Sequence, residues 1–493
     1  LQALFDSERG LAGHGAKALI RHLFGRGITV NDLTLDTQLG AYLLDPAEAR
    51  YVLDDLVARY AQYELPTDSA AEEGQLDLDG TSTPTAQIAA RQALGVAKLA
   101  GPMLEALDAQ GLRSLNDDIE VPLVLVLAKM EHLGVGVDVA RLTALRDELS
   151  AEADRLRGLV IEDAGEDFNV NSTKQLREIL FDKLGLTPQK KTKTGYSTDA
   201  QTLEKMRDDH PIVEHLLEYR EVEKLRSTYG EGLLAEVGEG DRIRATFNQT
   251  VARTGRLSSD QPNLHNIPVR SDTGRVFREA FVAAEGKELL VADYNQIELR
   301  CIAHLAEDPG LIAAFEAGDD IHNATASRVF DVDPNEVTTE HRSKAKMVSY
   351  GLAYGMEAYG LGQRLGIPTG EAAEILDAYF EAFPAVKQYM DDTVNEARER
   401  GYTETLFGRR RQIPELASSN FRIRQSGERQ AMNAGIQGLA ADIFKVALVN
   451  LDRALTEREM EAVIILQVHD EVILEVPPSE LEDAKKLTVD VMG

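Results

Sequence analysis

The sequence predicts an α+β chain built from three or four lobes, and three observations lead to this prediction. The chain has 493 residues, which is too many for one hydrophobic core. Helical periodicity covers long stretches, above all residues 321–430. Two short runs rich in β-branched residues, 289–294 and 463–476, have the pattern of buried strands instead. Helix and strand segments therefore alternate in blocks.

The first block, residues 1–118, is expected to mix short helices with one extended piece. Its acidic, low-complexity stretch 68–80 is typical of a mobile loop. Asp32, Asp36 and Asp45 are spaced like caps and turns, not like ligands of one site. From its residues alone this lobe is predicted to be structural.

The second block begins near Ile119 and predicts a long helical arm with a basic tip. Asp138 is the expected N-cap of a helix whose leucines at 142, 145 and 149 form one stripe. Ser172 and Gln175 have the spacing of a capping box, and another helix is expected over 216–225. Lys190, Lys191 and Lys193 form the basic loop between them. Such an arm could hold a nucleic-acid duplex or serve as a spacer.

At Thr246 the alternation becomes that of a strand, and the segment RTGRLSS follows over residues 253–259. Gly255 allows a close approach of the backbone, and Arg256 offers a planar fork of donors. Residues 260–268 are expected to be loop, followed by the strand that ends at Asp293 and a helix over 297–305.

Within the helical stretch 321–430, Arg342, Lys346, Tyr350 and Tyr354 recur at four-residue intervals and share one helix face. Two cations followed by two aromatic rings suit a triphosphate and a base, although a solvated surface helix has the same spacing. Glycines at 351 and 355 predict a bend or hinge where the stripe ends.

Residues 463–476 predict a hairpin whose strands are buried and whose tip is His469, Asp470 and Glu471. Taken alone, this tip could be a solvated acidic turn. Beside a second strand that ends at Asp293, it offers two carboxylates that can bind hard cations. Two magnesium ions about 3.5 to 4 Å apart would activate a hydroxyl and neutralise pyrophosphate, with Arg342 and Lys346 stabilising the leaving oxygens. This combination is the chemistry of nucleotidyl transfer.

The net charge of −30 argues against a polyanionic partner. However, charges farther apart than about 8 Å are largely screened at physiological salt. Whether the chain can bind a polyanion therefore depends on how its basic residues are distributed. Between residues 405 and 430 the sequence has six arginines that are candidates for a phosphate-binding surface, although each could equally well solvate a helix face: Arg409, Arg410, Arg411, Arg422, Arg424 and Arg429. No apolar run approaches a membrane span, and no signal peptide opens the chain. The single cysteine, Cys301, excludes an internal disulfide and suits a reducing cytoplasm. Both ends are expected to be cuts in a longer protein, with the C-terminal lobe truncated.

Five segments resemble, in order, those of family A DNA polymerases. Three are signature motifs: residues 293–300, 342–355 and 467–471, with the sequences DYNQIELR, RSKAKMVSYGLAYG and QVHDE. Residues 254–259 and 429–438 also look like segments of that family. The resemblance runs through almost the whole chain and points to the large, Klenow-type fragment of a bacterial enzyme. It implies a monomer that takes primer-template DNA and dNTPs, works with two Mg²⁺ ions that Mn²⁺ can replace, and resides in the cytoplasm at the nucleoid.

The resemblance also implies a right-hand fold, with an antiparallel palm sheet and helical fingers and thumb, preceded by an RNase H-like exonuclease-type domain. The implied parts are 1–118 (exonuclease-like), 119–240 (thumb), 241–320 and 430–493 (palm) and 321–429 (fingers). The implied metal-site residues are Asp293, Asp470 and Tyr294; Lys346 and Glu471 join the two aspartates in catalysis. The implied nucleotide-binding residues are Arg342, Lys346, Tyr350, His322, Glu298 and Gln296. The implied DNA-binding residues are Arg256, Tyr354, Arg429, Asn433, Gln437, His469, Lys224 and Arg226.

Some positions depart from the family pattern. Asn295 stands where Ser is frequent, and Tyr350 stands where some members have Phe, which implies weaker discrimination against dideoxynucleotides. Leu19 stands where proofreading members have a metal-binding Asp, and a second expected Asp is missing around residues 86–93. These losses predict an inactive exonuclease domain. Two alternatives to a DNA polymerase are a single-subunit RNA polymerase and an inactive DNA-binding scaffold. Glu298 argues against an RNA polymerase, because a carboxylate there would crowd a ribose 2′-hydroxyl. The presence of both metal-binding aspartates argues against an inactive scaffold.

Overall fold

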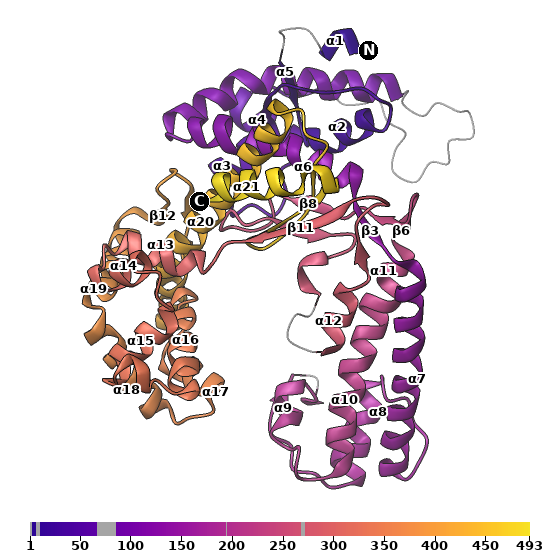
Figure 1. Ribbon diagram of the computed structural model, residues 1–493, viewed down its shortest axis with the longest axis vertical. Coiled ribbons are helices and arrows are strands. Elements are labelled where there is room, and N and C mark those ends of the chain that lie inside the picture. Colours follow the sequence, from indigo (N-terminus) through magenta and orange to yellow (C-terminus); the bar gives the residue numbers. More distant parts are fainter. Residues whose placement is uncertain (1, 6–9, 67–84, 194, 268–271) are drawn as a thin grey trace. The chain divides into compact units, whose positions relative to one another are not determined.

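The computed structural model describes residues 2–5, 10–66, 85–193, 195–267 and 272–493 (Figure 1). The acidic stretch expected at 68–80 lies outside the described residues. The chain divides into two compact units: residues 1–132, 247–258 and 287–493 form the first, and residues 133–246 and 259–286 form the second. Each unit has its own hydrophobic core. The prediction of three or four lobes differs from this division into two, because the N-terminal part is joined to the C-terminal part of the first unit, for example by the ion pairs of Glu120 with Arg409 and Lys445.

The N-terminal part of the first unit has helices around two short parallel strands, β1 (Leu11–Gly13) and β2 (Leu33–Asp36). Asp36 is buried and caps helices: its carboxylate accepts from the backbone N–H groups of Gly15, Ala16 and Gln38. The cap-like role expected for this aspartate is confirmed. The helices are α1 (Gln2–Phe5), α2 (Ala16–Phe24), α3 (Thr37–Leu44), α4 (Leu53–Ala61), α5 (Thr85–Ala109) and α6 (Val121–Leu133), with a π-helical turn at Leu115–Glu120. The 25-residue α5 is longer than the short helices expected.

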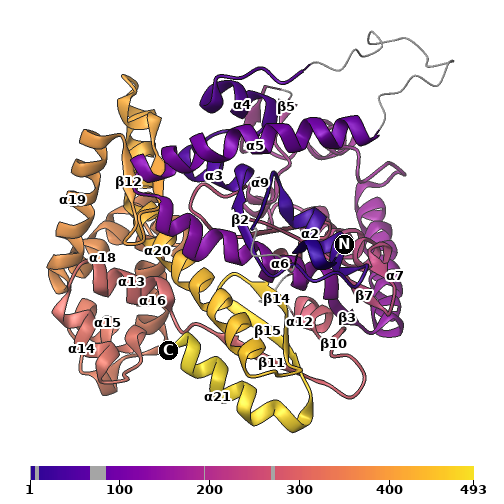
Figure 2. The same ribbon diagram turned by 90° about the horizontal axis from the view of Figure 1, so that it is seen from above.

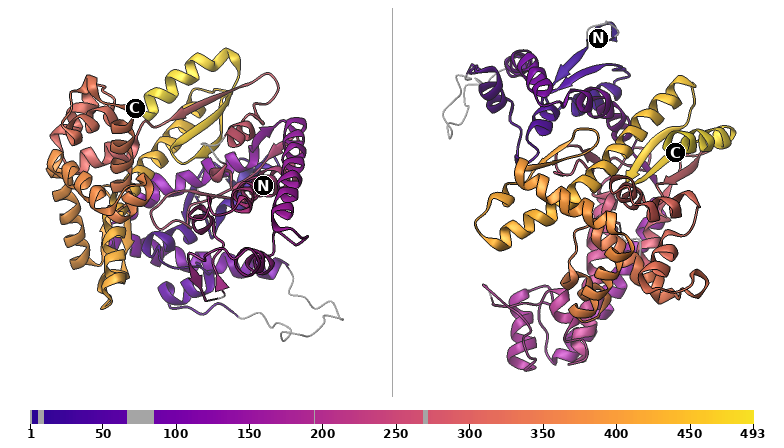
Figure 3. Two further views of the ribbon diagram at one scale, coloured as in Figure 1. Left: turned by 90° about the horizontal axis from the view of Figure 1, so that it is seen from below. Right: turned by 90° about the vertical axis from the view of Figure 1, so that its left-hand side faces the viewer.

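A three-stranded antiparallel sheet lies at the centre of the C-terminal part of the first unit. Its order is β11 (Glu288–Asp293), β15 (Glu471–Val476), β14 (Val463–Val468). The hairpin predicted at 463–476 is confirmed, and the strand that ends at Asp293 pairs with it. Helix α20 (Phe421–Glu457) contacts β14, and α21 (Leu481–Met492) contacts β11, so that helices cover this sheet (Figure 2 and Figure 3).

Helices fill residues 297–400 and share one core with the middle of α20. The helical stretch predicted over 321–430 is confirmed as far as residue 400 and again from residue 421, but it is wrong between them, where two short strands pair as a hairpin. The helices are α13 (Ile297–Leu305), α14 (Pro309–Glu316), α15 (Ile321–Phe330), α16 (Thr339–Ala353), α17 (Ala358–Leu365), α18 (Thr369–Ala382) and α19 (Pro384–Arg400). The stripe helix α16 ends at Ala353, and Gly355 has a φ of 64°, so the expected break after the stripe is confirmed. A hairpin of β12 (Tyr402–Glu404) and β13 (Arg410–Gln412) follows.

The second unit is the predicted helical arm, in which α7 (Val139–Ala164) and α10 (Pro211–Leu225) lie side by side (Figure 1). Asp138 caps α7, as predicted. Ser172 caps α8 (Thr173–Arg177), but the Gln175 side chain accepts from the N–H of Asn169, so a reciprocal capping box does not form. The basic tip is a small hairpin, β4 (Lys191–Thr192) with β5 (Gly195–Tyr196).

The remaining elements of the chain are short. They are α9 (Ala200–Glu204), α11 (Gly232–Ala235), α12 (Asp272–Arg278), β3 (Val135–Val137), β6 (Val237–Gly238), β7 (Arg242–Ile243), β8 (Thr246–Asn248), β9 (Ser258–Asp260) and β10 (Phe281–Val282). Within the second unit, β10, β3, β7 and β6 form a sheet.

By length and composition alone, α20 could cross a membrane, since one 18-residue window of this helix has a mean hydropathy of 1.3. However, 78% of that window is buried inside the structure, as in the core helix of a globular unit. Its apolar character is therefore weak support for a membrane span.

Candidate active site

Two carboxylates meet at one end of the central sheet. Asp293 is the last residue of β11 and lies opposite Glu471, the first residue of β15. Asp470 is in the turn that joins β14 to β15, and its carbonyl accepts from the N–H of Tyr294 at 3.1 Å. Turn and strand end are thus joined by a hydrogen bond, which holds Asp293 and Asp470 at the same edge.

The pKa values of both aspartates are raised above their ordinary values. Partial burial, followed by the charge of Glu471, raises the pKa of Asp293. Partial burial, followed by the charges of Asp293 and Glu298, raises the pKa of Asp470. Such a site favours a cation, because a positive charge would relieve the repulsion between carboxylates. Among the described residues no group of three or more His, Cys, Asp or Glu side chains has the arrangement of a metal site, so other oxygens would have to complete the ligand shell.

A cavity of 470 Å³ joins these carboxylates to the stripe on α16. The predicted stripe is confirmed, because all four of its residues line this one cavity. Twelve predicted site residues are among the lining residues: Arg256, Asp293, Tyr294, Gln296, Glu298, His322, Arg342, Lys346, Tyr350, Tyr354, His469 and Asp470. Gln296 and His469 have left-handed backbones, with φ of 58° and 57°, which is uncommon for residues with a side chain.

The cationic end of the stripe is fixed by an aspartate that the sequence did not single out. Arg342 donates to Asp320 Oδ2 through Nε at 3.0 Å and Nη2 at 2.8 Å. Asp320 also caps α15 by accepting from the N–H of His322 at 2.9 Å. Burial lowers the pKa of His322 to about 4, and the charges of Lys346 and Arg342 act in the same direction. His322 is therefore neutral at pH 7, with its ring 5.6 Å from that of Tyr350.

At the aromatic end, Glu298 is bound from two sides. It is mostly buried, forms an ion pair with Arg256, and accepts from Tyr354 Oη at 3.5 Å. These contacts connect the 253–259 segment, the first turn of α13 and the end of α16. Glu298 is thus held next to Tyr350 and Tyr354, as the predicted arrangement requires.

The predicted contacts Arg429, Asn433 and Gln437 fall on α20 at four-residue intervals, and none lines the cavity. Arg429 pairs with Glu357 at 3.3 Å. A Cβ at Gly355 would lie 2.7 Å from Asn433 Nδ2, so only glycine allows the chain to pass this closely. Asn433 Oδ1 is buried without a hydrogen-bond partner among the described residues, which leaves an acceptor available to a ligand.

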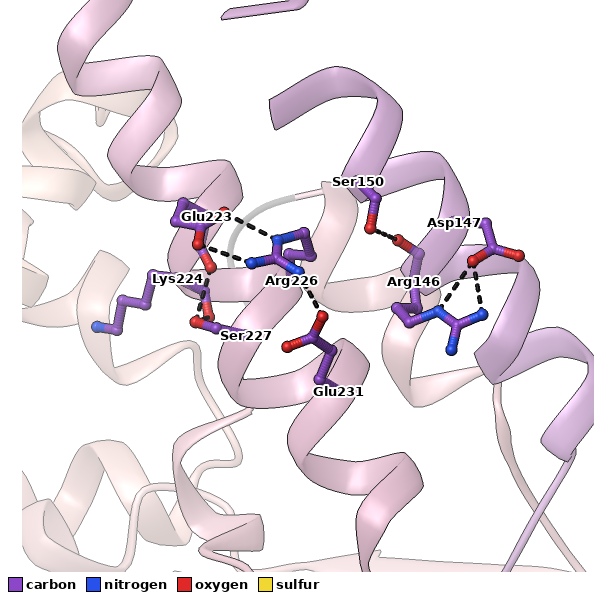
Figure 4. Close-up of polar contacts among 8 residues, drawn as sticks. All are labelled: Arg146, Asp147, Ser150, Glu223, Lys224, Arg226, Ser227 and Glu231. Atoms are coloured by element: carbon purple, nitrogen blue, oxygen red, sulfur yellow. Dashed lines mark hydrogen bonds and ion pairs between the residues drawn. The ribbon is translucent and has the colours of Figure 1, made fainter. Parts of the chain in front are cut away.

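Lys224 and Arg226 lie in the second unit, and Figure 4 shows how they differ. Arg226 donates to Glu223 Oε1 and Oε2, each at 2.8 Å, and also pairs with Glu231. Lys224 points away from this cluster (Figure 4), and no ion pair of its ammonium occurs within the described part of the chain. Of the two, Lys224 is the one available to a partner in this conformation.

Sequence reasoning missed a buried charge cluster next to the site. It consists of Glu120, Arg409, Asp442 and Lys445, all at most 5% exposed. Lys445 also contributes to the cavity lining, as does Phe444, whose ring is 6.2 Å from that of Tyr294. Asp442 and Lys445 are one turn apart on α20, whereas Glu120 and Arg409 are distant from them in the sequence. Arg409 is one of the arginines predicted to face phosphate between residues 405 and 430; for this residue the prediction is wrong, because Arg409 is buried between Glu120 and Asp442.

Comparison with known proteins agrees with this geometry. The model for "DNA polymerase family A" matches residues 139–493, which is more than two thirds of the chain. The chain belongs to DNA polymerase family A. The predicted family and the family A polymerase fold are thereby confirmed.

Similar family A proteins extend over nearly the whole chain. It is 46% identical to DNA polymerase I of Mycobacterium tuberculosis, over 99% of this chain and 55% of the relative. It is 45% identical to DNA polymerase I of Geobacillus stearothermophilus, over 100% of this chain and 55% of the relative. The chain therefore spans about half the length of these curated relatives. The structure is similar to the POL domain of Pol1 from M. smegmatis in complex with DNA primer-template and dNTP. That similarity has a TM-score of 0.92 and 42% identity, and it covers 100% of this chain and 84% of the other.

Proposed function

We propose that this chain is a DNA-templated DNA polymerase that adds deoxynucleotides to a primer 3′ end in replication and repair. The observation that carries the proposal is the cavity that joins the strand-end carboxylates to the stripe of Arg342, Lys346, Tyr350 and Tyr354. Cations opposite carboxylates suit a triphosphate whose leaving group gains negative charge. The M. smegmatis protein, by its title, binds primer-template and dNTP, which supports the same partners here.

Each side of the cavity has a separate role in this proposal. Arg342 and Lys346 would bind the triphosphate and stabilise the leaving oxygens, and the Lys346 ammonium would donate a proton there. Neutral His322 can donate one hydrogen bond to a phosphate oxygen. Glu298, which is held by Arg256 and Tyr354, would be a steric gate against a ribose 2′-hydroxyl and would favour deoxynucleotides.

Asp293 and Asp470 would hold two Mg²⁺ ions, for which Mn²⁺ could substitute, with Tyr294 at the same site. Partly buried carboxylates whose pKa values are raised by neighbouring carboxylates suit this use, and Mg²⁺ is normally held by one or two carboxylates together with substrate phosphates and water. When bound, the ions would lower the pKa of the attacking hydroxyl and neutralise the pyrophosphate. The chain's own residues hold these two carboxylates at one sheet edge by the pairing of β11 with β15.

The remaining predictions also belong to this proposal. In a monomeric enzyme of the cytoplasm, primer-template DNA would be contacted by Arg256, Tyr354, Arg429, Asn433, Gln437, His469, Lys224 and Arg226. Residues 1–118 would be an exonuclease-type domain without proofreading, in which the side chain of Leu19 is 51% exposed where a ligand carboxylate is expected.

The test is primer extension under Mg²⁺ with matched and mismatched 3′ ends. We expect extension of the matched primer, no release of a mismatched nucleotide, and loss of extension in Asp470→Asn with duplex binding retained. Extension by Asp470→Asn at the rate of the parent would refute the proposed site. Metal-dependent release of the mismatch, abolished only by changes within residues 1–118, would refute the absence of proofreading.

A single-subunit RNA polymerase is the competing activity. Comparing ribo- and deoxynucleotide incorporation by the parent and by Glu298→Ala separates the two. We expect the parent to prefer deoxynucleotides and the variant to lose much of that preference.

A further inference from the structure

A buried hydroxyl from the N-terminal part of the first unit contacts the segment that carries Arg256. Tyr42 lies on α3, is 1% exposed, and belongs to the hydrophobic core that α3 forms with α4 and α5. Its Oη donates to the Ala252 carbonyl at 2.7 Å, across 210 positions of the sequence. A buried hydroxyl needs a hydrogen-bond acceptor, and this one finds its acceptor outside its own core. The bond therefore ties the N-terminal core to the segment that leads into the cavity wall.

The acceptor of this hydrogen bond also closes a tight turn. The Ala252 carbonyl accepts from the N–H of Gly255 at 3.2 Å, so residues 252–255 fold back on themselves. Gly255 has a φ of 84°, and a Cβ at this position would lie 2.5 Å from Arg409 Nε. Tyr42 therefore holds the carbonyl that closes the turn, at the point where the chain is about to reach Arg256.

Other elements hold the same segment. Gln249 Nε2 donates to the Glu120 carbonyl at 3.0 Å and to its Oε2 at 2.7 Å. A Cβ at Gly438 would lie 3.5 Å from the Thr254 carbonyl oxygen, so α20 also packs closely on the turn. With these neighbours in place, the hydroxyl of Tyr42 is the contribution that the α3 core makes to the position of the turn.

The position of the turn matters because Arg256 follows it directly. The Arg256 guanidinium forms the ion pair with Glu298, and both side chains line the cavity. Glu298 also accepts from Tyr354 Oη at 3.5 Å. A rotation of the turn would move the Arg256 backbone, and with it the donor fork that holds Glu298. A contact at Ala252 can therefore act on Glu298 through Arg256.

We propose that Tyr42 is a positioning residue for nucleotide selection, because its hydroxyl holds the turn 252–255 that places Arg256 against Glu298. Residues 1–118, for which proofreading is predicted to be absent, thereby contribute a residue to the geometry of the polymerase site. Burial raises the pKa of Tyr42 to about 12, so the hydroxyl keeps its proton and can donate at the pH of an assay. The inference rests on the proposed polymerase function, in which Glu298 selects deoxynucleotides.

The experiment compares Tyr42→Phe with Tyr51→Phe, because each variant removes one hydroxyl and keeps the ring. Tyr51 is the matched control: it is 7% exposed in the same core, and its Oη donates at 2.8 Å to the carbonyl of Asp45, within residues 1–118. The measured quantity is the sugar preference, the kcat/KM for a deoxynucleotide divided by that for the matching ribonucleotide.

We expect Tyr42→Phe to lower the sugar preference by about twofold to fivefold, the upper value being equivalent to the net contribution of one hydrogen bond. Tyr51→Phe should leave the sugar preference unchanged. A sugar preference that is equal in Tyr42→Phe and the parent would overturn the proposal, and so would an equal loss in Tyr51→Phe.

A double-mutant cycle tests whether the effect passes through Arg256. Arg256→Ala removes the guanidinium that the turn places, so adding Tyr42→Phe to this variant should change the sugar preference little. If Tyr42→Phe lowered the sugar preference by the same factor with and without Arg256, the proposed route would be wrong.

Hydrogen exchange separates this inference from the proposed function. Amides within residues 249–257 should exchange faster in Tyr42→Phe than in the parent or in Tyr51→Phe, because the turn loses a hydrogen bond. A parent chain that does not extend a primer would refute the polymerase assignment, and the exchange rates would still decide whether Tyr42 holds the turn. Equal exchange of this segment in all three proteins would overturn the proposal.

Discussion

Replacing Glu120 by glutamine is expected to destabilise the first unit more than any exposed carboxylate change. Glu120 is fully buried and accepts from Lys445 Nζ at 2.6 Å and from Arg409. Gln249 donates to the other carboxylate oxygen at 2.7 Å. Arg409 retains its ion pair with Asp442 at 2.7 Å after the change, whereas Lys445 loses its one ion pair among the described residues.

Two separate arguments give the expected loss in the free energy of unfolding for Glu120→Gln. Removing one member of a buried ion pair typically costs about 3–5 kcal/mol, because the partner's charge stays buried and uncompensated. Burial alone would raise the pKa of Glu120, but the charges of Lys445 and Arg409 outweigh it and lower the pKa from 4.5 to about 2. A lowering of this size corresponds to about 3 kcal/mol of stability. Burial lowers the pKa of Lys445 to about 8, so this cation is only partly compensated. Glu120 contacts two cations, and its lowered pKa sets the size of the expected loss of stability.

The direction of the Glu120 pKa shift predicts a pH dependence of stability that can be measured. Since the pKa of Glu120 is lower in the folded state, its contribution is fully present above pH 4.5 and is lost as pH falls toward about 2. Urea denaturation of the parent and Glu120→Gln should therefore differ by about 3 kcal/mol at pH 7, with a gap that closes in acid.

Two controls make this prediction specific. The double variant Glu120→Gln with Lys445→Met should recover much of the loss, because it removes the uncompensated charge. Glu152→Gln, which breaks the exposed pair with Arg155, should change stability by less than about 1 kcal/mol. A loss below about 1 kcal/mol for Glu120→Gln, or a double variant less stable than the sum of its parts, would refute the reasoning.

Three further predictions concern the site. Gly255→Ala should destabilise by about 1–3 kcal/mol in thermal denaturation, because φ is 84° and the new Cβ would lie 2.5 Å from Arg409 Nε; a neutral change would contradict this. Asp320→Ala should raise KM for dNTP, because Arg342 loses the carboxylate that holds its guanidinium, and an unchanged KM would contradict this role. The same change should lower the free energy of unfolding by about 1 kcal/mol, because α15 loses its N-cap. Tyr350→Phe should increase discrimination against dideoxynucleotides in competitive incorporation, and equal discrimination in both proteins would exclude a role for the phenol.

Local patterns in the sequence were enough to predict the elements that form the site. The 463–476 hairpin, the strand ending at Asp293 and the face of α16 each depend on residues that are neighbours along the chain, so periodicity reveals them. The motif order then indicated family A. The capping box at Ser172 failed for a local reason too, since Gln175 found a competing donor in Asn169.

The charged residues that surround these elements could be identified only from the tertiary structure. Asp320, Glu120 and Lys445 are charged residues whose partners are 22 to 325 positions away in the sequence, so no window of the sequence contains the pair. Arg226, predicted as a DNA contact, is held by Glu223 and Glu231, which are three and five residues away, so the spacing of these charges along the helix could have indicated this pairing. The sequence by itself therefore determined the strand ends, the stripe and their chemistry. The three-dimensional fold decided which charged side chains are buried, which are paired and which can bind a partner. Burial and long-range pairing depend on how distant segments pack together, and local sequence patterns do not contain that information.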